Sequence, residues 1–219
     1  MREQLSAKFR ARRDVRLREL IVDLARNKKP LRVIDVGGRV AYWRRVGLDF
    51  LRQHQVEVRI VNLFESELEP VGDAADVLSC GVADACNLAF PDNSFDLYHA
   101  NSVIEHVGGW GNMKRYAAEA RRVARHYYVQ TPNFWFRVEP HFWKFPAIHW
   151  LPRPLAAWLM LHFPLAHTGK ARSMDKAFAM LEGAQLLTRK QMQFLFPDAQ
   201  VHSERLFGLA KSFIAIRRY

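Results

Sequence analysis

The chain has 219 residues, of which 49% are hydrophobic and 25% are charged, a balance that excludes an intrinsically disordered protein. Only Cys80 and Cys86 are present, which excludes a disulfide framework. The longest apolar run of the second half, 155–161, is too short to span a bilayer. The basic opening segment lacks the apolar core of a secretory signal, so we expect a cytoplasmic protein.

The net charge of +11 is concentrated near the beginning of the chain. Residues 1–32 hold eleven Lys or Arg against four Asp or Glu, a local net charge of +7. A solvated basic helix over 1–30 accounts for this pattern. Attraction to anionic lipid or to RNA remains the alternative.

The first two thirds of the chain alternate between predicted strands and helices. Leu17, Leu20, Ile21 and Leu24 repeat at helical spacing, which predicts an amphipathic helix over 4–26. The run LRVIDV then predicts a buried strand over 31–36. The same patterns predict, in chain order, a helix over 42–54, strands over 56–63, 76–82 and 95–101, a helix over 113–123 and a strand over 127–131. This alternation indicates βαβ crossovers and a parallel sheet.

Residues 133–167 interrupt the alternation with many aromatic residues and prolines. We predict an insertion or lid made of loops, with one helix near 154–162, that packs over the sheet and forms a wall of the substrate pocket. The tail predicts a helix over 188–196 and an antiparallel pair of strands over 200–206 and 211–217.

The turn after the first strand reads Asp35-Val36-Gly37-Gly38-Arg39. Ligands of open parallel sheets bind beyond the carboxyl ends of the strands, so this turn is the first candidate site. A dinucleotide fingerprint that starts at Gly37 needs glycines at 39 and 42, where the chain has Arg39 and Tyr42. Nicotinamide and flavin cofactors are therefore disfavoured.

Several motifs at successive strand ends form a recognisable set. They are Asp84-Ala85 before Leu88-Ala89-Phe90, Phe95-Asp96 at the start of a strand, Glu105-His106 after that strand, and Gln130-Thr131-Pro132-Asn133. Over residues 32–149 this set resembles the class I S-adenosylmethionine-dependent methyltransferases, particularly the type 11 group. The resemblance implies an α/β, Rossmann-like fold in a single domain, 1–219. Its sheet would be mainly parallel and seven-stranded, with helices on both faces and a C-terminal antiparallel strand pair.

The resemblance also implies a site for S-adenosylmethionine. Asp35 would anchor the loop and face the amino end of the methionine moiety, and the backbone of Gly37 and Gly38 would pass close to the cofactor. The other expected contacts are the ribose at Asn62 and Leu63, the adenine at Asp84, Ala85 and Cys86, and the methyl group at Asn101 and Ser102. Asn62 replaces the acid usual at its position, and Arg39 and Ala41 replace common glycines. Structural alternatives are a turn cap for Asp84, an ordinary strand end for Asn62 and a helix start for His106.

Catalysis of methyl transfer requires orientation and, for a hydroxyl acceptor, a base. His106, beside Glu105, is the first candidate base because histidine titrates near neutrality, and His141 is the second. In similar metal-dependent enzymes a further Glu precedes the Glu-His pair, and Ser102 stands in its place here. We therefore predict no metal site.

The acceptor is the least defined partner. The aromatic insertion favours O-methylation of a small or lipid-linked molecule, with peripheral contact to an anionic membrane assisted by the basic helix. An RNA methyltransferase ranks below this, because arginines and aromatic rings can grip single strands but no RNA-binding motif is present. A non-catalytic, cofactor-binding or interaction protein of the same fold is the third hypothesis, and it rests on the changes at Arg39, Ala41 and Asn62.

Overall fold

A computed structural model describes residues 2–137, 147–165 and 169–218. Seven strands form one sheet in the order β3-β2-β1-β4-β5-β7-β6. Their bounds are β1 (Leu31–Val36), β2 (Val56–Asn62), β3 (Leu78–Val82), β4 (Phe95–Asn101), β5 (Ala124–Pro132), β6 (Gln200–Leu206) and β7 (Leu209–Arg217). The first five strands are parallel, and β7 is antiparallel to both β5 and β6. The predicted fold class is confirmed, including the closing antiparallel pair.

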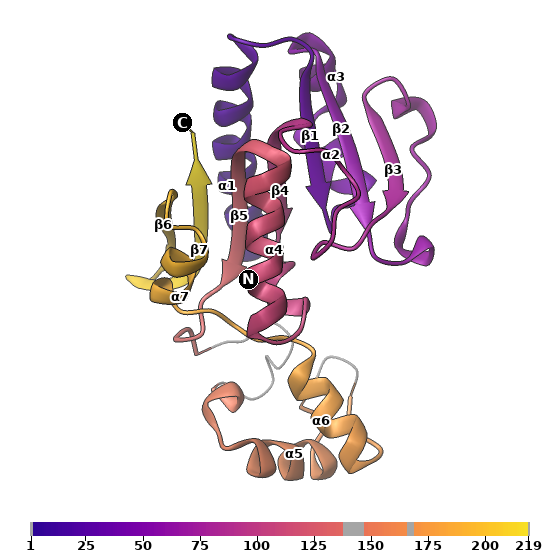
Figure 1. The fold of residues 1–219 in the computed structure, drawn as a ribbon. Coiled ribbons are helices and arrows are strands. Elements are labelled where there is room, and N and C mark those ends of the chain that lie inside the picture. The colour runs from indigo at the N-terminus through magenta and orange to yellow at the C-terminus, as the bar shows by residue number, and fades with distance from the viewer. Residues whose placement is uncertain (1, 138–146, 166–168, 219) are drawn as a thin grey trace.

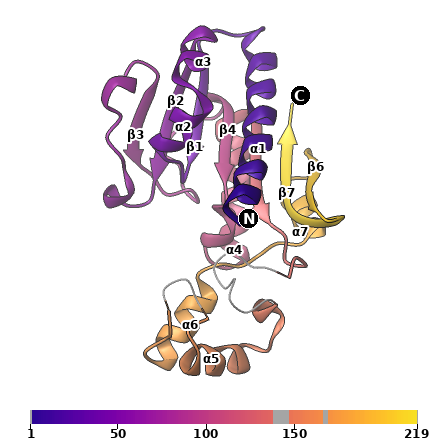
Figure 2. The same cartoon turned by 180° about the vertical axis from the view of Figure 1, so that it is seen from behind.

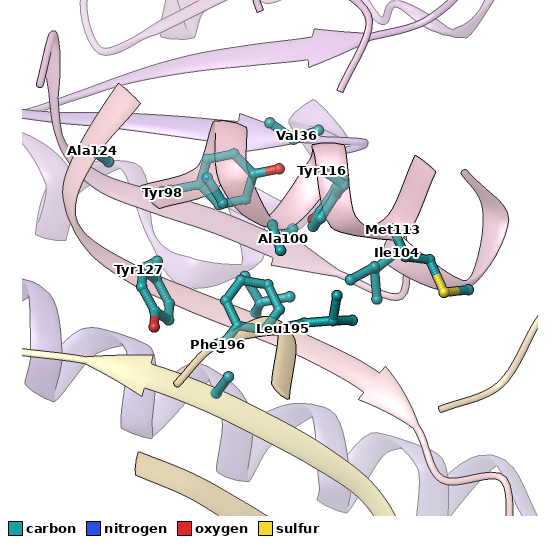
Figure 3. Close-up of a cluster of buried hydrophobic side chains, with 14 of the residues drawn as sticks. Val36, Tyr98, Ala100, Ile104, Met113, Tyr116, Ala124, Tyr127, Leu195 and Phe196 are labelled. Carbon is teal, nitrogen blue, oxygen red and sulfur yellow. The ribbon is translucent and has the colours of Figure 1, made fainter. Parts of the chain in front are cut away.

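Helices cover both faces of this sheet, as Figures 1 and 2 show. On one face lie α1 (Arg2–Ala25), α2 (Val40–Val46) and α3 (Leu48–Gln53). On the other face lie α4 (Trp110–Val123) and α7 (Arg189–Leu195). Each face has its own core because side chains alternate along a strand: Leu97 of β4 packs toward α1, whereas Tyr98 packs toward α4. Figure 3 shows the α4 side, where Tyr98, Tyr116, Tyr127 and Phe196 are buried together.

The predicted single helix over 42–54 is wrong. Gly47 has a φ of +116°, outside the helical range, and divides the segment into α2 and α3. Its N–H still bonds to the carbonyl of Trp43 and closes α2. Glycine takes this conformation without the steric cost that a side chain would add, so the chain turns at this residue.

A small lobe lies beyond the carboxyl ends of the parallel strands (Figure 1). It contains α5 (Arg153–His162), near the helix expected at 154–162, and α6 (Met174–Glu182), which the sequence analysis did not predict. Its apolar centre is separate from the two main cores and includes Ile148, Ala157, Met160 and Ala177. The chain leaves the sheet at Asn133 and returns at Leu187, and these two residues form a β-bridge.

The helices of the described ranges are too short or too polar for any of them to cross a membrane.

Candidate functional site

The turn between β1 and α2 is shaped by two glycines. Gly37 has a φ of +70°, and a Cβ there would lie 2.5 Å from Cγ2 of Val103. At Gly38 a Cβ would lie 1.7 Å from Oδ2 of Asp35. No side chain fits at either position, so bare backbone forms this edge of the site.

Asp35 lies beneath this turn, with 1% of its surface exposed. Its two carboxylate oxygens accept hydrogen bonds from Nε1 of Trp43 and Nδ1 of His99, both at 2.6 Å. The hydroxyl of Tyr42 is 3.4 Å from Nε2 of the same histidine. Burial, followed by the charge of Asp35, holds the pKa of Tyr42 well above its usual range, so this phenol stays neutral. Asp35 thus fixes the turn from below and does not line the cavity described next.

A cavity of about 1000 Å³ opens at the carboxyl ends of β1, β2 and β4. Of the predicted site residues, it is lined by Gly37, Asn62, Leu63, Asp84, Ala85, Cys86, Ser102 and His106. Asp35, Gly38, Asn101 and Glu105 lie outside the lining. Within the described part of 133–167, no residue lines it either.

Asn62 and Asp84 each have one polar group engaged within the protein. Nδ2 of Asn62 donates to the carbonyl of Gly38 at 3.0 Å, which ties β2 to the glycine turn. Oδ1 of Asp84 accepts from the backbone N–H of Cys86 at 2.8 Å, and the Asp84 carbonyl accepts from the Asn87 N–H. Asp84 therefore caps this turn, as the structural alternative predicted. The cap uses Oδ1 and does not involve Oδ2. Burial raises the pKa of the neighbouring Cys86 thiol, which keeps it protonated at neutral pH.

Beyond β4, a polar chain of contacts connects the cavity to α1. Ser102, at a φ of +60°, donates from Oγ to Oε1 of Gln130 at 2.9 Å. Nη1 of Arg13 also donates to that oxygen, at 3.0 Å, and to Oδ1 of Asn101 at 2.7 Å. Asn101 is therefore held by the N-terminal helix, and Ser102 alone of this predicted pair faces the cavity.

The Glu-His pair divides into a buried and an exposed member. Glu105 is fully buried and accepts a hydrogen bond from Oγ1 of Thr131 at 2.9 Å. His106 is exposed at the cavity, and its Nδ1 lies 2.5 Å from the carbonyl oxygen of Gly183. Because a carbonyl only accepts, Nδ1 carries the proton, and in the neutral ring the lone pair is on Nε2. His141 lies outside the described residues.

The segment that returns from the lobe touches both members of this pair. Besides Gly183, the backbone N–H of Gln185 donates to the carbonyl of Glu105 at 2.7 Å. The base of the lobe therefore borders the side of the cavity where His106 lies.

Sequence reasoning missed part of the lining, including Phe64, Val103, Asn112 and Arg115. Asn112 and Arg115 belong to the first turns of α4. Nδ2 of Asn112 donates to the Val107 carbonyl at 2.6 Å, and its Oδ1 accepts from Arg115. These two residues could have been predicted from the sequence. A helix that follows a parallel strand begins at the edge of the sheet where that strand ends, which is the edge that carries the cavity. No cluster of three or more His, Cys, Asp or Glu side chains suited to a metal occurs in the described ranges.

Comparisons with known proteins agree with this architecture. A methyltransferase from Methanosarcina mazei is 16% identical with a TM-score of 0.52, and the match covers 86% of this chain and 92% of that one. One from Aquifex aeolicus is 11% identical with a TM-score of 0.50, over 91% and 87% of the two chains. Phosphoethanolamine N-methyltransferase 2 of Haemonchus contortus, solved with S-adenosylhomocysteine, is 16% identical with a TM-score of 0.50, over 80% and 35%. At these identities the likenesses show the fold.

The family is indicated by the sequence itself. A comparison with curated proteins gives no significant match. Residues 46–127, which include Asn62, Asp84 and His106, match the type 11 family of methyltransferase domains. By sequence, residues 46–127 are therefore similar to a methyltransferase domain, and the fold around them is that of S-adenosylmethionine-dependent methyltransferases.

Proposed function

We propose that the enzyme methylates a hydroxyl group of a small or lipid-linked acceptor, with His106 as the general base. The observation that carries this proposal is the position of His106 in the cavity lining, with Nδ1 bonded to Gly183. A base must present a lone pair to the proton that it removes, and this bond assigns the lone pair to Nε2. Gly183 would position the histidine directly, through its carbonyl. Glu105 would position it from the neighbouring residue, because Thr131 and the N–H of Gln185 hold Glu105 in place.

S-adenosylmethionine would occupy one end of the cavity. The bare backbone at Gly37 would let the methionine part approach, Asn62 and Leu63 would border the ribose, and Oδ2 of Asp84 would accept from the adenine amino group. Bound cofactor supplies a methyl group on a positively charged sulfur that leaves as a neutral thioether. The chain's own contribution would be to orient the acceptor oxygen toward that methyl group and to hold its proton on His106.

The size of the cavity supports a small acceptor. Small-molecule sites usually enclose about 300–1000 Å³, and this cavity of about 1000 Å³ is at the upper end of that range. It therefore has room for an acceptor beside the cofactor. Ser102 and His106 would border the acceptor, because both lie at the end nearest β4.

The test is a labelled-methyl screen of cell-extract fractions, followed by His106→Ala on the fraction that takes up label. We expect label in a small-molecule or lipid fraction, and turnover lower by about 10²–10⁴ in the variant, the usual loss for a general base. Cofactor affinity, measured by calorimetry, should stay near normal. His54→Ala is the matched control, because His54 follows α3 away from the cavity.

Two results would contradict the proposal. Equal loss of cofactor binding and turnover in His106→Ala would make the histidine structural. Label that enters only RNA would assign a different acceptor class.

A further inference from the structure

A second cavity, of about 130 Å³, lies between α1 and β6. Its lining contains Arg12, Arg13 and Arg16 of α1, with Ser203, Glu204 and Arg205 of β6. Figure 2 shows α1 running beside β7, with β6 next to β7 at the edge of the sheet. This cavity is separate from the methyl-transfer site, since the two linings share no residue.

Helical spacing brings the arginines together. Arg12 and Arg16 are four residues apart, so they project from the same side of α1. Arg205 comes from a distant part of the chain, and only the packing of β6 beside α1 brings it to the cavity. Three arginines from two elements thus line one cavity together with Ser203. Nη1 of Arg205 donates to the Gly208 carbonyl at 3.1 Å, and Oγ of Ser203 accepts from Arg189 at 3.1 Å, so the other N–H groups of Arg205 and the Ser203 hydroxyl proton are available as donors.

The positive charge of this cavity is not balanced within the protein. Four arginines face one carboxylate, Glu204, which leaves a net charge of +3 in the lining. That carboxylate is already engaged, because Oε1 lies 3.5 Å from Nε of Arg13 and Oε2 accepts from Ser212. Among the described residues, Arg12 and Arg16 have neither an ion pair nor a side-chain hydrogen bond.

Burial and this positive charge together lower the pKa of two neighbouring groups. The pKa of His202 is lowered, first by burial and next by Arg16. The pKa of Lys211 is lowered, first by burial and next by Arg13. Burial disfavours a charge of either sign, whereas the contribution of the arginines reflects a positive potential, and this potential would favour an anion.

We propose that this cavity binds a phosphate group. Guanidinium groups present planar pairs of N–H donors that match phosphate oxygens, and they are the side chains most used for phosphate recognition. Arg12, Arg16 and Arg205 supply the donors, and Ser203 adds a hydroxyl. Arg13 does not take part in phosphate binding, because it keeps its hydrogen bonds to Asn101 and Gln130 and its ion pair with Glu204. In this position it supports the wall of the cavity. The phosphate can belong to a lipid headgroup or to a soluble phosphorylated molecule.

The test uses the double variant Arg12→Gln/Arg16→Gln. The matched control is Arg26→Gln/Lys190→Gln, which removes the same charge from residues outside the cavity. Inorganic phosphate is titrated by calorimetry in chloride buffer of constant ionic strength, and melting temperatures confirm that each variant folds. We expect saturable binding to the wild type and the control, and affinity at least tenfold weaker in the cavity variant.

A second arm identifies the source of the phosphate. Sedimentation is compared between vesicles of phosphatidylcholine alone and vesicles that also contain phosphatidic acid. Loss of phosphatidic-acid binding in the cavity variant alone would assign the site to a headgroup. Phosphate binding without such a loss would assign it to a soluble phosphate.

The proposal would be overturned by absence of saturable phosphate binding to the wild type, or by equal loss of affinity in both double variants. Binding of RNA through Arg12 and Arg16, without binding of phosphate or of phosphatidic-acid vesicles, would overturn it as well. None of these measurements depends on methyl transfer, so the result is independent of the acceptor.

Discussion

Gly38 is the residue where the turn after β1 tolerates least change. A Cβ at this position would overlap Oδ2 of Asp35, and that carboxylate is held in place by Trp43 and His99. We expect Gly38→Ala to lower the free energy of unfolding by about 1–3 kcal/mol, the usual cost of overpacking, and to weaken cofactor binding. Denaturant titration and calorimetry measure the two effects.

Gly111→Ala is the control for this substitution, because a Cβ at Gly111 meets nothing within 4 Å. The free energy of unfolding of this variant should stay unchanged or rise by up to about 1 kcal/mol, since alanine restricts the unfolded chain. If the two variants were equally stable, the overlap at Gly38 would be relieved by movement of the turn.

Asp84 combines a turn cap with the proposed adenine contact, and two substitutions separate these roles. Asp84→Asn keeps an oxygen for the N–H of Cys86, whereas Asp84→Ala removes it. We expect Asp84→Ala to weaken S-adenosylmethionine binding by about 1–3 kcal/mol in calorimetry, the cost of leaving a polar partner unmatched. Asp84→Asn should preserve stability but bind less tightly than the wild type, because charge-assisted hydrogen bonds are stronger. Unchanged affinity in both variants would mean that Asp84 caps the turn and does not contact the cofactor.

Much of the site was accessible from sequence, because the carboxyl ends of parallel strands meet at one edge. Asn62, Asp84 and Ser102 reach the same cavity for this reason. The place of Asp35 was not accessible, since its partner His99 is 64 residues away and a strand pattern does not show which polar groups meet in the core. The contact of Arg13 with Asn101 across 88 residues left no sequence signal either.

At the scale of elements, α1 is an integral part of the fold. Its apolar side, with Leu17, Leu20, Ile21 and Ala25, belongs to the core of the sheet face that also carries α2 and α3. Between residues 9 and 25, this apolar side of the helix is therefore buried against the sheet, and Arg13 is also directed inward, onto Asn101 and Gln130. Of the basic segment predicted over 1–30, the part from residue 9 to residue 25 has both exposed and buried side chains.

Substitution of Leu20 tests this role of α1. Leu20 is fully buried, so Leu20→Ala should lower the free energy of unfolding by about 2–5 kcal/mol in denaturant titration. Val15 on the same helix is 56% exposed, and Val15→Ala should change the free energy by no more than about 0.5 kcal/mol. Equal, small effects would mean that α1 is only loosely attached.

The elements that sequence analysis predicted well are those with a complete local signal. Strands β1, β4 and β6 have the bounds expected from their apolar patterns and flanking turns. A capping box at Thr188, with Gln191 bonding back to the Thr188 N–H, defines the start of α7. The helix α6 was missed because its buried side rests on the small lobe rather than on the main core, and only Ala177 is fully buried. The strand β5 starts three residues earlier than predicted because it follows α4 without a loop.

For the whole molecule, charge and exposed aromatic surface lie toward the same end. The N-terminal half of α1 points to the carboxyl ends of the parallel strands, and the α5–α6 lobe lies beyond them (Figure 2). The lobe exposes 41% of Trp150, 49% of Trp158 and 49% of Phe163. We propose that this end rests on an anionic membrane, where burial of aromatic rings and attraction of basic side chains add. A lipid-linked acceptor would reach the cavity from the same side.

Vesicle sedimentation across a salt series tests this arrangement. The wild type should bind vesicles that contain phosphatidylglycerol weakly, and less as salt rises, because attraction of lysine and arginine to the surface is screened. Trp150→Ser/Trp158→Ser should reduce binding about tenfold, since partial burial of two such rings is worth about 1.4 kcal/mol or more. Phe194→Ser, at an aromatic residue of α7 that is 66% exposed, should leave binding unchanged. Equal losses in both variants would show that no defined face meets the membrane, and tight, steeply salt-dependent RNA binding would favour a nucleic acid partner instead.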